Sequence, residues 1–215
     1  MLIQNSQQDI HFYNKKRKIG IKISGGADSA IVLYMLCKYI VENNTGAKII
    51  PITVNHEGKD YQEKYAKQVI NYCKNIFGNI FSQHYIARNP TPDTYVQTQI
   101  DLVNTLYFKD IINCHYVGIT RNPPKEISDT FGHPGPSDDR SPGWHRNTVI
   151  ENKIFRPLIN IDKKGVAELY DTLGVTDTLF PLTRSCEAVT SDFTEHCKTG
   201  CWFCQERYWG FGRYE

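Results

Sequence analysis

The chain has 215 residues, of which 40% are hydrophobic and 22% charged, a composition that is typical of globular proteins and excludes a disordered or fibrous chain. Its 25 Lys and Arg residues exceed its 23 Asp and Glu residues by only two charges, so no overall field attracts nucleic acid or an anionic membrane. No stretch has the pattern of a leader or the length of a membrane span. We therefore expect a cytoplasmic protein with one main domain and a small appendage.

The first regular elements expected along the chain are a strand and a helix that flank a glycine-containing turn. Residues 18–23 form a short β-branched run that ends at Ser24-Gly25-Gly26, a sequence that suits a tight turn with exposed backbone amides. Apolar residues then recur with a helical period at Ile31, Val32, Met35, Leu36 and Tyr39, until the polar stretch 42–46. This pattern predicts a buried strand followed directly by a helix.

The next segments repeat this alternation of strand and helix. The pattern predicts strands at 48–54, 80–86 and 115–119, and helices at 61–77 and 95–112. This order predicts an α/β fold, a doubly wound parallel sheet that helices cover on both faces and right-handed crossovers connect. We assign residues 1–160 to this main domain.

Residues 120–152 break the alternation, because they are rich in Pro, Gly, Ser, Asp and Arg. Loops of this length are either functional lids or disordered, and the position after a strand's carboxyl end favours a lid. Order resumes at Phe155, and Asp162 is expected to cap a helix over 163–172 that ends near Gly174. Residues 161–215 are therefore predicted to form a smaller, helical C-terminal segment.

The turn Ser24-Gly25-Gly26-Ala27-Asp28-Ser29 is a candidate phosphate-binding loop. Glycines let backbone N–H groups approach phosphate, and the N-terminus of the following helix adds its dipole. Ser24 and Ser29 can donate hydroxyl hydrogen bonds to phosphate, whereas Asp28 is expected to hold Mg²⁺ or to cap the helix. The alternative is an ordinary turn, but the strand before it, the helix after it and the complete run of residues favour phosphate binding.

This run matches the fingerprint Ser-Gly-Gly-x-Asp-Ser without a mismatch, so the chain resembles the PP-loop ATP pyrophosphatases. The resemblance implies the fold of the adenine nucleotide alpha hydrolases and cleavage of ATP between its α- and β-phosphates. Such enzymes adenylate a carbonyl or carboxylate oxygen, which a nucleophile later displaces. The resemblance further implies ATP and Mg²⁺ as cofactors, catalytic roles for Ser24, Asp28 and Ser29, and nucleotide contacts from Ser24, Gly25, Gly26, Ala27, Asp28, Ser29 and Val54.

Four cysteines lie close together near the C-terminus, namely Cys186, Cys197, Cys201 and Cys204. Four thiolates at this spacing can close a tetrahedral zinc site, so we favour Zn²⁺. The alternatives are an iron–sulfur cluster, a redox pair or unligated core cysteines. His196 adjoins the second cysteine and can replace or support a ligand, and the aromatic residues over 202–214 are expected to pack around the metal.

The order of segments in the C-terminal part resembles the 7-cyano-7-deazaguanine synthases. Pro157-Leu158 precedes the expected helix, which ends in Leu173-Gly174-Val175, and the run Leu182-Thr183-Arg184-Ser185-Cys186 leads into the other cysteines. The resemblance implies an ATP-dependent ligase of queuosine biosynthesis that converts a carboxylated 7-deazaguanine and ammonia to an amide and then a nitrile. On this basis nucleic acid is not required, and a homodimer is left open. Residues 120–126, Arg184 and the cysteine spacing depart from the family, so the resemblance bears more on the chemistry than on the substrate.

Three residues are candidates for binding the substrate. Arg121 and Arg184 can each orient a carboxylate or phosphate through paired hydrogen bonds, with a structural ion pair as the alternative. His56 lies at the carboxyl end of a predicted strand, where open α/β sheets bind their ligands, although an ordinary loop position fits as well.

Two other functions compete with the ligase. A tRNA-thiolating or sulfonucleotide-reducing PP-loop enzyme needs a reactive cysteine that no metal holds. A zinc-stabilised binding protein would keep the nucleotide fold without chemistry, but the intact loop at 24–29 argues against it. We expect an ATP-dependent carbon–nitrogen ligase that forms AMP and pyrophosphate.

Overall fold

The computed structural model describes residues 1–56, 61–89, 91–133, 135–141, 145–186, 196 and 200–215. Its strands are β1 (Leu2–Ile3), β2 (Ile10–His11), β3 (Lys18–Lys22), β4 (Lys48–His56), β5 (Tyr85–Asn89), β6 (Cys114–Tyr116), β7 (Val149–Ile150) and β8 (Ile154–Phe155). Its helices are α1 (Ala27–Glu42), α2 (Tyr61–Phe77), α3 (Tyr95–Phe108), α4 (Lys125–Ser128), α5 (Lys163–Thr172) and α6 (Trp202–Phe211), with 3-10 turns at Pro92–Thr94, Asp138–Arg140 and Phe180–Leu182.

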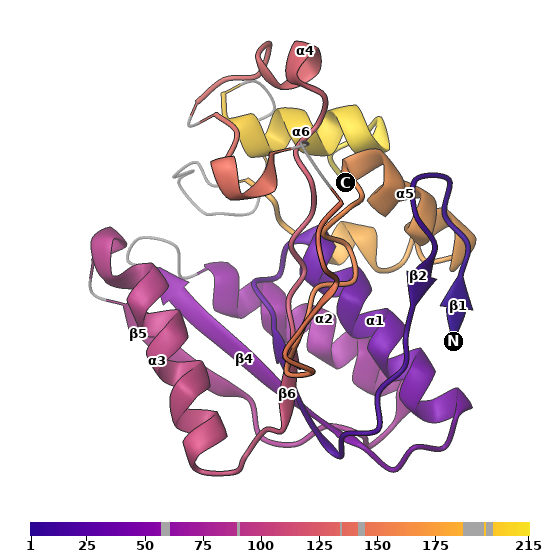
Figure 1. The fold of residues 1–215 in the computed structure, drawn as a ribbon. Helices are drawn as coiled ribbons and strands as arrows, with labels where there is room; N and C mark the ends of the chain where they lie inside the picture. Colours follow the sequence, from indigo (N-terminus) through magenta and orange to yellow (C-terminus); the bar gives the residue numbers. More distant parts are fainter. Residues whose placement is uncertain (57–60, 90, 134, 142–144, 187–195, 197–199) are drawn as a thin grey trace.

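The central sheet has the strand order β5-β4-β3-β6-β8-β7, and all its strands are parallel except β7 (Figure 1). Ile19 of β3 pairs with Ile49 of β4 on one side and with Cys114 of β6 on the other. The chain leaves β3 outward to β4 and β5 and then returns to the opposite side with β6. The carboxyl ends of β3 and β6 therefore flank the crevice where such sheets bind ligands, and the predicted doubly wound α/β sheet is confirmed.

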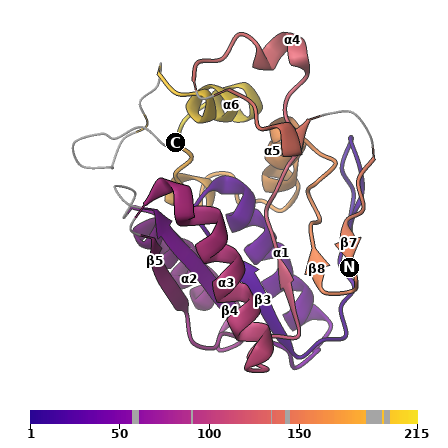
Figure 2. The same cartoon turned by 60° about the vertical axis from the view of Figure 1, so that its left-hand side comes forward.

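Side chains that alternate along the strands build a separate apolar core on each face of the sheet. Ile49 belongs to the larger core, which also contains buried residues of α1, α2 and α5. Ile50 and Ile52 belong to a smaller core with Val103 and Leu106 of α3. Because successive strand residues point to opposite faces, α3 covers one face and α1, α2 and α5 pack on the second, which Figure 2 shows from the side of α3.

The start of α5 is fixed from two directions. The carboxylate of Asp162 caps the helix by accepting hydrogen bonds from the backbone N–H groups of Lys164 and Gly165, as predicted. The N-terminal hairpin of β1 and β2 reaches the same turn, where Asn5 Nδ2 donates to the Gly165 carbonyl at 2.8 Å and Gln7 Nε2 donates to Asp162 at 2.7 Å. These contacts hold the first turn of α5 in place.

The predicted elements differ from the structure mainly at short strands. The helix at 61–77 is confirmed, but the strand predicted at 80–86 is wrong, since β5 begins at Tyr85 and Phe81 forms only an isolated bridge. The region predicted as a loop at 120–152 contains α4, a 3-10 turn and β7. The division into domains at 160 stays a prediction, and α5 shares its apolar core with α1.

Within the described part of the chain, no helix combines the length and the apolar character that crossing a membrane requires.

Candidate functional site

The predicted phosphate loop lies between β3 and α1. Gly26 is the N-cap residue of α1, so Asp28 lies in the first helical turn and does not cap the helix, which corrects one of its two predicted roles. The hydroxyls of Ser24 and Ser29 lie 3.3 Å apart, and the Ser24 hydroxyl also accepts from the Gly26 N–H. The N–H groups of a first helical turn have no partner within the helix, so this loop directs donors and the positive end of the α1 dipole at one point.

The two glycines of the loop serve different purposes. Gly25 has φ +80°, and a Cβ atom there would lie 2.4 Å from the Cβ of Tyr65 in α2. Gly26 has φ −77°, and a Cβ atom there would meet nothing closer than 3.4 Å. Backbone conformation and packing thus require glycine at position 25, whereas position 26 leaves space in front of the helix N-terminus.

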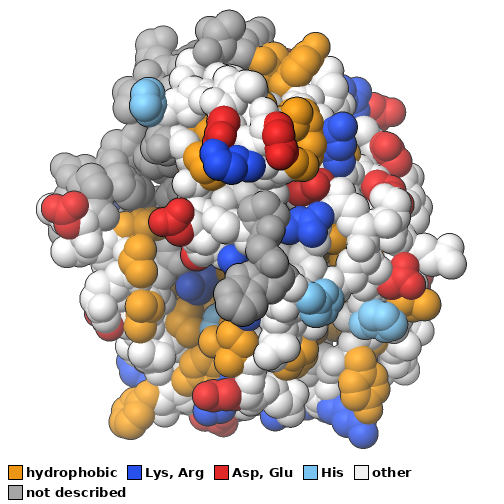
Figure 3. Space-filling view, turned by 45° about the horizontal axis from the view of Figure 1, so that its top comes forward, with side chains coloured by type: hydrophobic (Ala, Val, Ile, Leu, Met, Phe, Trp, Pro, Cys, Tyr) orange, Lys and Arg blue, Asp and Glu red, His pale blue; other side chains and the backbone are white. Residues whose placement is uncertain are grey.

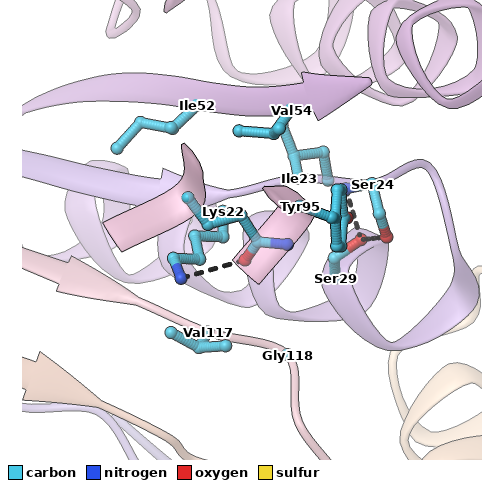
Figure 4. A pocket seen from close by; sticks show the side chains of 10 residues that line it. Lys22, Ile23, Ser24, Ser29, Ile52, Val54, Tyr95, Val117 and Gly118 are labelled. Atoms are coloured by element: carbon cyan, nitrogen blue, oxygen red, sulfur yellow. Dashed lines mark hydrogen bonds between the residues drawn. The ribbon is translucent and has the colours of Figure 1, made fainter. Parts of the chain in front are cut away.

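An apolar pocket of about 170 Å³ opens at the point where the strand order reverses (Figure 4). It is lined by Lys22, Ile23, Ser24, Ser29, Ile52, Val54, Tyr95, Gln99, Val117 and Gly118. Val54, which is predicted to contact the nucleotide, lines this pocket. Gly118 packs so closely on α1 that a Cβ atom would lie 2.7 Å from the backbone of Ser29. The pocket therefore has the apolar walls, and Ser24 and Ser29 at one end, that a nucleoside joined to phosphates requires.

A second, polar pocket of about 170 Å³ lies on the other side of the loop. It is lined by Ser24, Gly26, Ala27, Asp28, Tyr61, Gln62, Arg140, Lys163, Arg184, Ser185, Cys186, Phe203 and Glu206. Ser24 lines both pockets. The phosphate loop thus separates an apolar cavity from one lined by charged residues and by a cysteine.

A buried charge network forms the floor of the polar pocket. Lys163 Nζ lies 2.6 Å from both carboxylate oxygens of Asp28 and 3.5 Å from Glu206. Glu206 also pairs with Arg140, and the side chains of Lys163 and Glu206 are only 4% and 3% exposed. Buried charges persist in proteins when they are paired. The two cations and two carboxylates balance, and the ammonium of Lys163 lies beside the phosphate loop.

Arg207 of α6 forms hydrogen bonds to the segment 183–185, which contains Arg184. Its guanidinium is fully buried and donates to the hydroxyls of Thr183 and Ser185 at 2.9 and 3.0 Å. Burial lowers the pKa of Arg207 to about 10. The backbone N–H of Arg184 in turn donates to the Gly25 carbonyl at 2.9 Å. Helix α6 is therefore linked through this segment to the phosphate loop.

Three of the four predicted metal ligands come together. The sulfurs of Cys186, Cys201 and Cys204 all lie within 4.8 Å of one another, and all three residues are buried. Hydrogen bonding with the sulfurs of Cys186 and Cys201, followed by burial, raises the pKa of the Cys204 thiol well above its usual range. Cys197 lies outside the described residues. The cluster is compatible with a metal site, and Cys186 places that site at the wall of the polar pocket.

The other predicted substrate residues have different positions. Arg184 lines the polar pocket, and its guanidinium lies 5.0 Å from the ring of Tyr61. Arg121 lines neither of the two pockets; it donates to Gln7 at 3.3 Å and lies 3.9 Å from Asp162. His56 is the last residue of β4, and its side chain lies outside the described part of the structure.

Sequence reasoning missed Lys163, Glu206 and Arg140. Lys163 follows the cap residue of α5, where a lysine is ordinarily a surface residue. No pattern in the sequence distinguishes it from the neighbouring Lys164. Glu206 follows Cys204 by two residues, in a helix whose bounds were not predicted. The Cys201–Cys204 pair was one available signal for Glu206. When metal ligands lie at the start of a helix, residues of the next helical turn lie near the same site.

No family model matches the chain. The tRNA-specific 2-thiouridylase MnmA of Polaromonas naphthalenivorans is 22% identical over 192 residues, which cover 75% of this chain and 47% of that protein. The tRNA(Ile)-lysidine synthase of Rickettsia bellii is 26% identical over 170 residues, covering 74% of this chain and 37% of that protein. These relatives are PP-loop ATP pyrophosphatases. The superfamily that the loop at 24–29 predicts is thus supported by similarity over most of the chain.

Among solved structures, the U34-tRNA thiolase NcsA from Methanococcus maripaludis, determined with its [4Fe-4S] cluster, matches with a TM-score of 0.48 and 15% identity, over 76% of this chain and 59% of that one. The chain spans about half the length of the thiouridylase relatives, or 47% of the first. The finer prediction, closeness to 7-cyano-7-deazaguanine synthase, stays a prediction.

Proposed function

We propose that the protein is an ATP-dependent enzyme that activates a carbonyl oxygen of a tRNA base by adenylation, so that a sulfur or nitrogen nucleophile can replace that oxygen. The observation that carries this proposal is the position of the phosphate loop between an apolar pocket and a polar pocket that contains Lys163 and the cysteine cluster. The names of the sequence relatives, a tRNA thiouridylase and a tRNA lysidine synthase, support tRNA as the substrate class.

ATP fits the site with its adenosine in the apolar pocket and its phosphates at the N-terminus of α1. Val54 and Ile52 provide apolar contacts there, and Gln99 and Tyr95 offer polar groups at the wall. The phosphates would meet the hydroxyls of Ser24 and Ser29, the first-turn N–H groups and the Lys163 ammonium. The α-phosphorus then faces the polar pocket, where the base is placed.

The reaction proceeds in two balanced steps. The carbonyl oxygen of the base attacks the α-phosphorus, an O–P bond forms, and the bond to the bridging oxygen of the β-phosphate breaks, so pyrophosphate leaves. The nucleophile then forms a bond to the activated carbon, and the C–O bond breaks as AMP leaves with the oxygen. Lys163 can neutralise charge that develops on the α-phosphate, which is the kind of electrostatic stabilisation that lowers such barriers most.

Mg²⁺ fits the polar pocket beside ATP, because Asp28 presents a carboxylate there and carboxylate oxygens are preferred ligands of Mg²⁺. Asp28 would hold the ion beside the phosphates. When bound, the ion would neutralise phosphate oxygens and favour departure of pyrophosphate.

The cysteine cluster fits one tetrahedral Zn²⁺ ion. A zinc ion with Zn–S bonds of about 2.3 Å holds its sulfurs about 3.8 Å apart, and Cys186 and Cys201 have sulfurs 3.9 Å apart. In a [4Fe-4S] cluster each cysteine binds a different iron, and in a [2Fe-2S] cluster one iron takes only two of the cysteines, whereas here three sulfurs lie within 4.8 Å of one another. The close spacing supports Zn²⁺, held by the three clustered cysteines and, by the sequence pattern, Cys197.

Replacing Cys204 with serine is expected to remove most of the zinc, because one ligand of a buried set is lost and the others repel one another. Structural zinc contributes on the order of 10 kcal/mol of apparent binding free energy, so the melting temperature should fall as well. Metal content by mass spectrometry tests this, with Cys73→Ala as a control, since Cys73 is buried outside the cluster. Equal amounts of iron and labile sulfide in the wild type would show that the cysteines bind an iron–sulfur cluster and not zinc.

The acceptor is tested by incubating the metal-loaded protein with ATP, Mg²⁺ and bulk tRNA, with sulfide or ammonium as nucleophile, and analysing the nucleosides by mass spectrometry. AMP formation that depends on tRNA, together with a nucleoside of altered mass, is expected. A parallel reaction contains carboxylated 7-deazaguanine and ammonium. AMP formed only in that reaction would overturn the tRNA proposal in favour of the deazaguanine ligase, and no AMP with any acceptor would indicate a nucleotide-binding protein.

A further inference from the structure

A third cavity, of about 410 Å³, lies where the chain enters β7 and leaves β8. It is lined by His145, Arg146, Asn147, Ile150 and Arg156, and we call it the arginine pocket. No carboxylate is among these lining residues. Neither arginine takes part in an ion pair with any other described residue. The pocket therefore holds an excess of positive charge.

The two arginines are held close together although they repel each other. Burial and the nearby charge of Arg146 lower the pKa of Arg156. Arg156 Nη2 donates to the Asn147 carbonyl at 2.8 Å, but its Nε is buried and has no hydrogen-bond partner within the described structure. A buried donor without a partner costs about 1–3 kcal/mol, and more when it is charged. An anion in the pocket would relieve the repulsion between the two guanidinium groups.

The backbone beneath the pocket is well fixed. Asn160 accepts from the backbone N–H of Arg146 at 2.7 Å and donates to its carbonyl at 2.8 Å. The backbone N–H of Arg156 donates to the Thr148 carbonyl at 2.7 Å. Among the described residues, the guanidinium of Arg146 donates one hydrogen bond, of 3.2 Å, to the Ser141 carbonyl. A planar guanidinium of this kind can still bind a phosphate through paired hydrogen bonds.

The arginine pocket lies at the same edge of the sheet as the phosphate loop. Arg156 follows β8 directly, and the Val117 N–H donates to the Phe155 carbonyl at 2.9 Å, so β8 ends level with the wall of the apolar pocket. β8 and β3 are separated only by β6, which corresponds to about 10 Å across the sheet. Arg140 lines the polar pocket, and the six-residue step from there to Arg146 spans at most about 21 Å of extended chain.

We propose that the arginine pocket binds a phosphate group of the polynucleotide backbone that flanks the base held in the polar pocket. This inference rests on the proposed function, since it requires a nucleic-acid substrate. The face seen in Figure 3 carries basic and acidic side chains side by side, and the net charge is only +2. Binding to RNA therefore depends on local sites of this kind, which position the strand without reading its sequence.

The test is binding of fluorescently labelled bulk tRNA in the absence of ATP, measured from 50 to 200 mM salt. Arg146→Gln and Arg156→Gln are each expected to weaken binding about fivefold at 0.1 M salt and to reduce the slope of log K against log salt by about 0.7–0.9, the value for one phosphate contact. Arg17→Gln is the matched control, because Arg17 immediately precedes β3, at the opposite edge of the sheet. That variant should bind like the wild type.

Equal slopes for the wild type and both pocket variants would overturn the proposal, as would an equal loss in Arg17→Gln. Arg156 also donates a hydrogen bond to the Asn147 carbonyl, so Arg156→Gln can fail to fold. In that case the result for Arg146→Gln alone tests the proposal. A titration of each variant with ATP shows whether the pocket binds a phosphate of ATP or one of the polynucleotide. The affinity for ATP should not change, and a loss of ATP affinity equal to the loss for tRNA would contradict the assignment. The binding assay needs no turnover. An absence of AMP formation would therefore refute the proposed function without changing the measured effect of the arginine variants on tRNA binding.

Discussion

Replacing Lys163 with methionine is expected to lower the rate of AMP formation by about 10²–10³, the usual effect of removing one preorganised group that stabilises transition-state charge. The ammonium of Lys163 contacts Asp28 and Glu206 and lies beside the phosphate loop. Methionine keeps most of the side-chain volume but leaves both carboxylates without this cation. Breaking a buried pair in this way costs about 3–5 kcal/mol of stability, so activity is measured by single turnover at a temperature where urea titration shows the variant folded.

The matched control is Lys164→Met. This neighbouring lysine is exposed, and its ammonium lies 4.9 Å from the ring of Trp209, away from the polar pocket. The control variant should keep wild-type activity and most of its stability. If Lys163→Met remained fully active when folded, the ammonium would be a structural cation only and the catalytic role assigned to it would be wrong.

Replacing Gly25 with alanine is expected to abolish ATP binding and to lower the free energy of unfolding by about 3 kcal/mol, the sum of a left-handed backbone and overpacking. A Cβ atom at this position would lie 2.4 Å from the Cβ of Tyr65 and 2.8 Å from the backbone nitrogen of Ala66. Helix α2 cannot yield without moving the core, so the phosphate loop must shift. A displacement of about 1 Å at such a site costs roughly 10²-fold in activity.

Gly78→Ala provides the control for backbone strain. Gly78 has φ +74°, close to the +80° of Gly25, but a Cβ atom there would meet nothing within 4 Å. Denaturant titration should show a loss of about 1–2 kcal/mol for this variant, with ATP binding unchanged. Equal losses in the two variants would mean that packing against α2 has no role in positioning the loop.

The sequence predicts the sheet and the long helices because their apolar residues repeat over many positions. Helix α2 and the Asp162 cap of α5 follow from such patterns. The strands β1, β2, β7 and β8 have two residues each, too few for an alternation to be visible. Their pairing is decided by neighbours that are distant in the sequence.

The candidate site was predictable where chemistry is concentrated in a short motif. The run from Ser24 to Ser29 and the cysteines near the C-terminus are of this kind. Within the helical segment predicted at 161–215, the bounds of α6 were not predicted, because its aromatic residues and cysteines do not form one apolar face. As a result Glu206, buried against Lys163, had no visible partner, and only the fold brings the two charges together.

The most direct test of the proposed function is to identify the products formed from ATP in the presence of bulk tRNA, Mg²⁺ and a nucleophile, with ATP labelled at the α-phosphorus or at the γ-phosphorus in parallel reactions. AMP and pyrophosphate are expected in equal amounts, at a rate that depends on the acceptor and falls in Lys163→Met. Release of ADP and inorganic phosphate instead would contradict the proposed function, because the loop would then direct attack at the γ-phosphate and not at the α-phosphate.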